Sequence, residues 1–224
     1  MSSYKENYKS IFEANRKWAA EQVKADPNFF ANLANNQDPD YLYIGCSDSR
    51  VHANEIMGLN AGEVFVHRNI ANMVINTDLN ALSVINYGVE YLNVKYIVVC
   101  GHYNCGGIKA AMQHLDQGIL NPWLRCVRDV YRLHRNELDA IKDEEERYRR
   151  FVEINTYEQC LNVIKTAEVQ KSYHQKGYPV VECWVYDVND GLLHDLHIDM
   201  DKELDRIREI YDITRNQPKN SNNK

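Results

Sequence analysis

The stretch YIVVC at residues 96–100 decides the fold. It is a nearly continuous apolar run, which is typical of a central strand in a parallel sheet. The runs YLYIGC at 41–46, EVFVH at 63–67 and PVVECWVY at 179–186 predict three further strands. Because helical patterns alternate with these strands, we expect an α/β fold: a mainly parallel central β-sheet flanked by helices.

The rest of the chain reads mostly as helix. Apolar spacing predicts helices over 4–35, 78–93 and 199–214, with a mostly helical region at 118–176 and a further helix after Gly106-Gly107. Asp26-Pro27 should interrupt the first helix, since a residue before proline avoids the helical region. Asp190-Gly191 indicates a hairpin turn into 192–196. We therefore expect a single α/β domain at 37–215, preceded by an N-terminal helical arm (1–36) and followed by a disordered polar tail (216–224).

Composition narrows the classes of function. The chain has 224 residues, is 44% hydrophobic and carries a net charge of −6 without a basic stretch, which argues against nucleic acid as a partner. No apolar run is long enough for a membrane span. The charged N-terminus lacks the apolar core of a signal peptide, so we expect a cytoplasmic protein whose six cysteines stay reduced.

Two short polar segments follow predicted strands. CSDSR at 46–50 leaves the first strand, and HYNCGG at 102–107 leaves the strand at 96–100. In open α/β sheets, ligands bind at the carboxyl ends of the strands. The two thiols, the imidazole and the carboxylate in these segments form a credible ligand set for tetrahedral zinc: Cys46, His102, Cys105 and Asp48.

The residues alone leave alternatives open. Cys46, His102 and Cys105 would leave one position for water, and Asp48 would either fill that position or orient the water. A cysteine after a buried strand can also be a small buried hydrophobe, and an isolated H-x-x-C is a weak metal signal.

The combination of C-x-D-x-R with H-x-x-C-G-G resembles the signature of the β-class carbonic anhydrase family. GEVFVHRNIA at 62–71 and YDVNDGLL at 186–193 are similar to other segments of that family, most closely in its bacterial members. The resemblance covers roughly residues 25–210. It implies a zinc-dependent lyase (carbonate dehydratase) that reversibly hydrates carbon dioxide to bicarbonate and a proton by zinc-bound hydroxide. One zinc per chain would bind to Cys46, His102 and Cys105, with Asp48 paired to Arg50.

The resemblance also implies roles for residues outside the two motifs. Gln37 matches an amide that binds substrate, Phe65 and Tyr87 match positions that line an apolar pocket for carbon dioxide, and the Gly106 backbone amide should face the substrate. The family forms homodimers or homotetramers, with N-terminal helices that embrace a neighbour. Asp48 is expected to coordinate zinc at lower pH and to leave it for Arg50 at higher pH.

A regulatory bicarbonate site is a further expectation. Gly45 and Tyr186 match such a site in some bacterial relatives and Arg68 could supply the charge, but Tyr43 stands where those relatives have tryptophan. The alternative is that Tyr43 only fills the buried face of its strand. If the site exists, Gly45→Ala should relieve inhibition by bicarbonate without removing zinc.

Two other functions fit the same ligands. One is a related zinc hydrolase that acts on carbon disulfide or a similar substrate, which the sequence gives no specific reason to prefer. The other is a non-enzymatic zinc-binding protein in which Asp48 permanently closes the metal shell. Arg50 argues against the second, because a purely structural site needs no cation to withdraw its fourth ligand.

Overall fold

The structure, a computed structural model, describes residues 3–217, with side chains from residue 8 onward. Most of the polar tail predicted at 216–224 therefore lies outside the described residues. The chain divides into two compact units, Met1–Gln37 and Asp38–Lys224. Among the described helices, none combines the length and the apolar character needed to cross a membrane.

The first unit contains two helices, α1 (Ser3–Ala25) and α2 (Phe29–Asn35). They are interrupted at Asp26-Pro27, as the sequence predicts, and Asn28 N donates to Asp26 Oδ1 at 2.8 Å within the turn. Trp18 of α1 meets Phe30 of α2 edge to face, with ring centroids 5.7 Å apart. This aromatic contact holds the two helices together.

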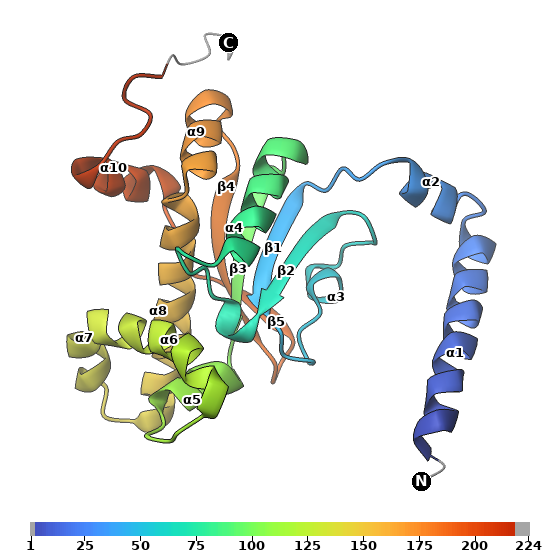
Figure 1. The fold of residues 1–224 in the computed structure, drawn as a ribbon, viewed down its shortest axis with the longest axis horizontal. Coiled ribbons are helices and arrows are strands. Elements are labelled where there is room, and N and C mark those ends of the chain that lie inside the picture. Colours follow the sequence, from blue (N-terminus) through green and yellow to red (C-terminus); the bar gives the residue numbers. More distant parts are fainter. Residues whose placement is uncertain (1–2, 218–224) are drawn as a thin grey trace. The chain divides into compact units, whose positions relative to one another are not determined.

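The second unit is built on a five-stranded sheet with the order β2-β1-β3-β4-β5 (Figure 1). The first four strands are parallel, and β5 pairs with β4 in the antiparallel direction. The bounds are β1 (Tyr41–Cys46), β2 (Val64–Asn69), β3 (Tyr96–His102), β4 (Val180–Asp187) and β5 (Leu192–Asp195). The predicted mainly parallel α/β fold is confirmed, with one antiparallel strand at the edge.

Different helices pack on the two faces of the sheet. Leu42, Ile44, Ile97 and Val99 pack in one core with α4, α8, α9 and α10. The intervening side chains, including Tyr43, point to the opposite face, where the short helix α3 (Ala53–Met57) packs. This alternation follows from the two-residue period of a strand.

The helices of the second unit differ from the prediction mainly at their ends. Their bounds are α4 (Leu79–Asn86), α5 (Gly106–Met112), α6 (Asn121–Leu133), α7 (Arg135–Ala140), α8 (Glu144–Ile164), α9 (Ala167–Lys176) and α10 (Met200–Ile210). The helix predicted at 78–93 changes at Tyr87 into a π-helical turn that ends at Tyr91. The helix predicted to reach Thr214 ends at Ile210, because Asp212 Oδ1 accepts hydrogen bonds from the Thr214 amide and hydroxyl and so forms a turn.

Beyond the carboxyl ends of β1 and β3, α5 to α8 form a second apolar cluster. Cys46 and Cys105 belong to this cluster, together with side chains such as Ile108, Leu124 and Phe151. Cys46 and Cys105 are therefore buried beneath this layer of helices, whereas Ser47, Ser49 and Arg50 in the loop after β1 are exposed.

Candidate metal centre

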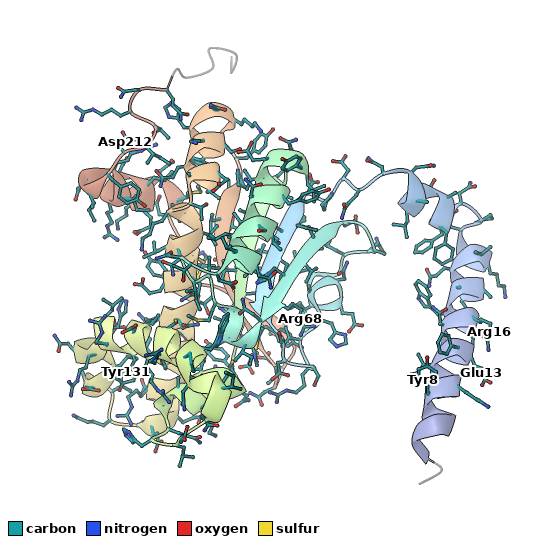
Figure 2. All side chains as sticks on the ribbon, viewed as in Figure 1. Tyr8, Glu13, Arg16, Arg68, Tyr131 and Asp212 are labelled. Atoms are coloured by element: carbon teal, nitrogen blue, oxygen red, sulfur yellow. The ribbon has the colours of Figure 1, made fainter. Side chains whose placement is uncertain are left out.

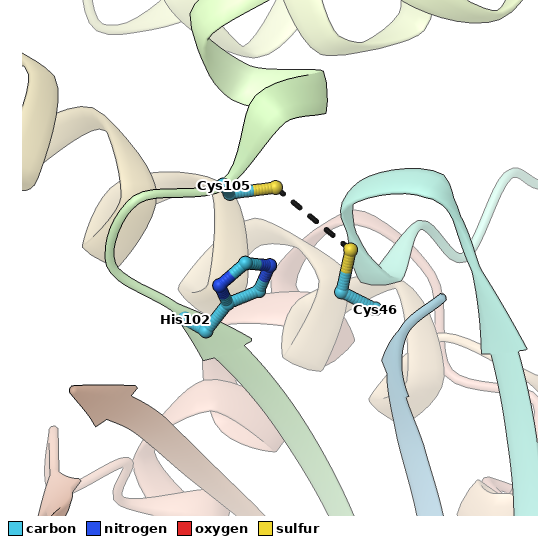
Figure 3. Close-up of side chains that lie close together, drawn as sticks. All are labelled: Cys46, His102 and Cys105. Carbon is cyan, nitrogen blue, oxygen red and sulfur yellow. Dashed lines mark hydrogen bonds between the residues drawn. The ribbon is translucent and has the colours of Figure 1, made fainter. Parts of the chain in front are cut away.

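Three chain segments bring Cys46, His102 and Cys105 together (Figure 3). Cys46 is the last residue of β1, His102 is the last residue of β3, and Cys105 immediately precedes α5. β1 and β3 are parallel neighbours, with Gly45 opposite Cys100, so both strands end at one edge. The potential ligand atoms of the three residues all lie within 4.8 Å of one another.

The His102 ring is held in one orientation. Its side chain is fully buried, and Nδ1 lies 2.9 Å from the backbone oxygen of Tyr103. A carbonyl oxygen only accepts, so the proton is on Nδ1 and the lone pair is on Nε2. Nε2 is itself buried and has no hydrogen-bond partner. A buried acceptor of this kind requires a partner, and a metal cation would supply one.

The two cysteines complete a donor set that fits zinc. Cys46 Sγ and Cys105 Sγ are 3.9 Å apart, and both residues are buried. The hydrogen bond from the Cys105 thiol lowers the pKa of Cys46, and the same interaction raises the pKa of Cys105. One thiolate is thus favoured before any cation binds, and two thiolates with one imidazole are typical zinc ligands.

Asp48 and Arg50 form a two-point ion pair beside this cluster. Arg50 Nε donates to Asp48 Oδ1 at 2.9 Å, and Arg50 Nη2 donates to Oδ2 at 2.7 Å. The Arg50 side chain, through these bonds, holds the pKa of Asp48 well below its usual range. Arg50 also donates to the backbone oxygen of Asn104 at 3.1 Å, which ties the pair to the second motif. Asp48 Oδ2 is 3.8 Å from His102 Nε2, so this carboxylate lies at the cluster while bound to Arg50.

Sequence reasoning missed three residues that position the cysteines. Ala71, with a positive φ of 65°, directs its backbone N–H to Cys46 and helps to lower the pKa of that thiol. Asn155 Nδ2 donates to the Ala71 oxygen at 3.1 Å, and Tyr148 Oη donates to the Cys105 oxygen at 3.0 Å. Asn155 and Tyr148 belong to α8, far along the chain from both motifs, so no local spacing could have identified them.

Comparison with known proteins identifies the family. A family model described as carbonic anhydrase matches residues 41–193, which include both motifs. The chain belongs to the β-carbonic anhydrase family. It catalyses the reversible hydration of carbon dioxide to bicarbonate and a proton, and it is therefore a lyase.

Several similar proteins come from fungi. A carbonic anhydrase from Emericella nidulans is 61% identical over 94% of this chain and 92% of its own length. A tetrameric β-carbonic anhydrase from Sordaria macrospora superimposes with a TM-score of 0.82 at 37% identity, over 86% of this chain and 98% of the other. The β-carbonic anhydrase CafA of Aspergillus fumigatus gives 0.84 at 35% identity, over 91% and 98%. The sequence motifs had suggested bacterial members, whereas these relatives are fungal.

The predicted substrate residues of the enzyme are only partly brought together. Phe65 and Tyr87 lie side by side, with ring centroids 5.8 Å apart. Phe65, however, stands four residues before Asn69, the β2 residue that pairs with Cys46, and four strand residues span about 13 Å. Within one chain these rings lie together but away from the metal cluster. Gln37 ends the first unit, and the roles of all three residues stay predictions.

Gly106 begins α5 next to Cys105, and a Cβ atom built there would meet nothing within 4 Å. The contact of the Gly106 backbone amide with substrate stays a prediction.

The residues of the predicted regulatory site lie around the end of β1. Arg68 is paired with Gly45, and it donates from Nε to the Cys46 oxygen at 2.8 Å and from Nη2 to the Asp48 oxygen. Tyr43 is fully buried, shares a cluster with Tyr186, and has a hydroxyl without a hydrogen-bond partner. Burial raises the pKa of Tyr43 strongly, so it stays neutral. Tyr43 thus fills the buried face of its strand, and bicarbonate binding at this group stays a prediction.

Gly45→Ala is a poorer test of that site than the sequence suggests. A Cβ at Gly45 would overlap the buried ring of Tyr43 at Cε1. We expect the substitution to lower the free energy of unfolding by about 1–3 kcal/mol, the usual cost of overpacking. Urea unfolding measures this effect. Gly106→Ala, which meets open space, is the control and should cause no such loss; equal stability of Gly45→Ala and wild type would contradict the expected clash.

Proposed function

We propose that carbon dioxide hydration by this enzyme depends on one zinc ion per chain, held by the thiolates of Cys46 and Cys105 and by Nε2 of His102. The observation that carries the proposal is the buried, unpartnered Nε2 beside two buried cysteines whose sulfur atoms are 3.9 Å apart. When bound, zinc lowers the pKa of water enough to supply hydroxide at neutral pH.

The chain's own residues then orient the reactants. Asp48 accepts a hydrogen bond from the attacking water and so directs an oxygen lone pair toward carbon dioxide. Arg50 keeps this carboxylate ionised and fixes its direction through two parallel hydrogen bonds. The Gly106 amide donates to an oxygen of the forming bicarbonate. The substrate-binding role of Gln37 stays a prediction. The Arg50-bound arrangement described here leaves Asp48 free to accept; its coordination of zinc at lower pH stays a prediction.

We also propose that the enzyme is a homodimer or a homotetramer. A similar enzyme from Sordaria macrospora is tetrameric. The helical arm exposes large apolar side chains, among them Ile11, Phe12 and Trp18, which a neighbouring copy would cover. Size-exclusion chromatography with light scattering measures the mass, and a monomer at micromolar concentration would contradict the proposal. The cytoplasmic location stays a prediction.

X-ray absorption at the zinc edge tests the ligand set. We expect two sulfur neighbours at about 2.3 Å and nitrogen or oxygen neighbours at about 2.0–2.1 Å. Four sulfur neighbours, or none, would contradict the assignment. The carbon disulfide hydrolase is not favoured, because the related proteins are carbonic anhydrases; sulfide release from carbon disulfide, measured beside hydration, checks this alternative directly.

A further inference from the structure

A cavity of the second unit lies among the helices α5 to α8. It has a volume of about 710 Å³, which is within the range of small-molecule sites. Figure 2 marks one of its lining residues, Tyr131, on this helical layer. The lining also includes the end of α5 at Ala111 and Met112. The cavity is thus separated from Cys105 by the length of α5, and none of the proposed zinc ligands lines it.

The lining is positively charged although the chain has a net charge of −6. Four arginines line the cavity, against two carboxylates, Asp139 and Glu144. The two exposed arginines have acidic partners: Arg132 Nε donates to Asp129, and Arg135 Nε donates to Asp139, each at 3.0 Å. Asp139 also accepts from the Tyr131 hydroxyl at 2.8 Å.

Arg128 of α6 and Arg147 of α8 differ from the two exposed arginines in their burial and in their partners. Both are half-buried, and neither forms an ion pair with any carboxylate in the part of the chain that the structure describes. Arg128 Nε donates to the Ala111 oxygen at 3.0 Å, and Arg147 Nη1 reaches the Ile141 oxygen only at 3.5 Å. Arg147 Nε is buried and has no hydrogen-bond partner. Asp139 is close enough for its pKa to be lowered by Arg147, but this carboxylate accepts its hydrogen bonds from Arg135 and Tyr131. The Arg147 Nε donor therefore stays unused, and an anion bound in the cavity would accept from it.

We propose that this cavity binds a small molecule that carries a phosphate group, with Arg128 and Arg147 as its anchors. Guanidinium groups bind phosphate oxygens through paired hydrogen bonds, and a phosphate dianion matches two otherwise unpaired arginines. Tyr131 and Met112 offer apolar surface to the rest of the ligand. Bicarbonate, with one charge and four heavy atoms, would leave most of the cavity empty, so the ligand differs from the product of the reaction.

Calorimetric titration of the zinc-loaded enzyme with phenyl phosphate tests the proposal. We expect one site per chain, with affinity at least about tenfold higher than for benzoate, which has the same ring and a single charge. Arg128→Gln and Arg147→Gln should each weaken phenyl phosphate binding by about tenfold or more. The matched control is Arg125→Gln, since Arg125 lies on the same helix as Arg128 but is exposed and does not line the cavity.

Labelling of the unmodified enzyme gives a second measurement that does not depend on folding of the variants. Phenylglyoxal reacts with accessible arginines, and peptide mass spectrometry locates the products. Phenyl phosphate should slow the modification of Arg128 and Arg147 but not that of Arg125. The absence of binding by the wild-type enzyme, unchanged affinity in the Arg128 and Arg147 variants, or protection confined to Arg50 at the active centre would each overturn the proposal.

Discussion

Cys105→Ser should lose zinc and, with it, carbon dioxide hydration. The serine hydroxyl stays protonated near neutral pH, so the site would lose one of two anionic donors, and the sulfur that lies 3.9 Å from Cys46 Sγ would be gone. We expect zinc affinity to fall by more than the 10–100-fold that loss of an outer-sphere partner typically costs. Competition with a fluorescent chelator measures the affinity, and elemental analysis measures the zinc content.

The matched control is Cys126→Ser, which makes the same chemical change on α6. The Cys126 thiol is half-buried, contacts the Pro122 oxygen at 3.9 Å and does not belong to the metal cluster. This variant should keep one zinc per chain. Full zinc occupancy in a folded Cys105→Ser protein would rule out Cys105 as a ligand.

Arg50→Ala should nearly abolish hydration and leave zinc in place. The substitution removes both side-chain hydrogen bonds that hold Asp48, whose Oδ2 is already 3.8 Å from His102 Nε2. The released carboxylate could then occupy the open position of the metal shell, so we expect a loss of hydration rate of about 100-fold or more, as for other groups that orient a reacting proton. Stopped-flow hydration assays and zinc analysis of the same sample separate the two effects.

Arg50→Lys refines this expectation. A lysine retains the charge but cannot make two parallel hydrogen bonds to one carboxylate, so its rate should fall between those of wild type and Arg50→Ala. Arg125→Ala, an exposed site outside the centre, serves as the control. Near-normal hydration in Arg50→Ala would mean that Asp48 needs no partner to stay in position.

The core of the fold could be predicted from the sequence because its strands are nearly continuous apolar runs. β1 begins and ends at the expected residues, Tyr41 and Cys46. The first helix is interrupted at Pro27, as expected because the residue before a proline avoids the helical region. Apolar runs of this kind leave few alternatives to a buried parallel strand. The helix ends were less predictable, since the end of α10 at Ile210 depends on the side-chain hydrogen bonds of Asp212.

The proximity of Cys46, His102 and Cys105 also followed from strand order, because neighbouring parallel strands end at one edge of the sheet. The contacts that position these three residues could not be predicted from strand order. Asn155 and Tyr148 reach the two cysteine loops from α8, and the strained backbone at Ala71 has no sequence signal, since alanine rarely adopts positive φ. Arg128 and Arg147 likewise line one cavity only because α6 packs on α8.

The central claim is that one zinc ion at this cluster makes the chain a carbonic anhydrase. Stopped-flow measurement of carbon dioxide hydration during stepwise zinc reconstitution of the metal-free protein tests it most directly. The account predicts that the rate rises in proportion to bound zinc and reaches its plateau at one zinc per chain. Equal hydration before and after zinc binding, or none in folded protein with one zinc bound, would contradict it.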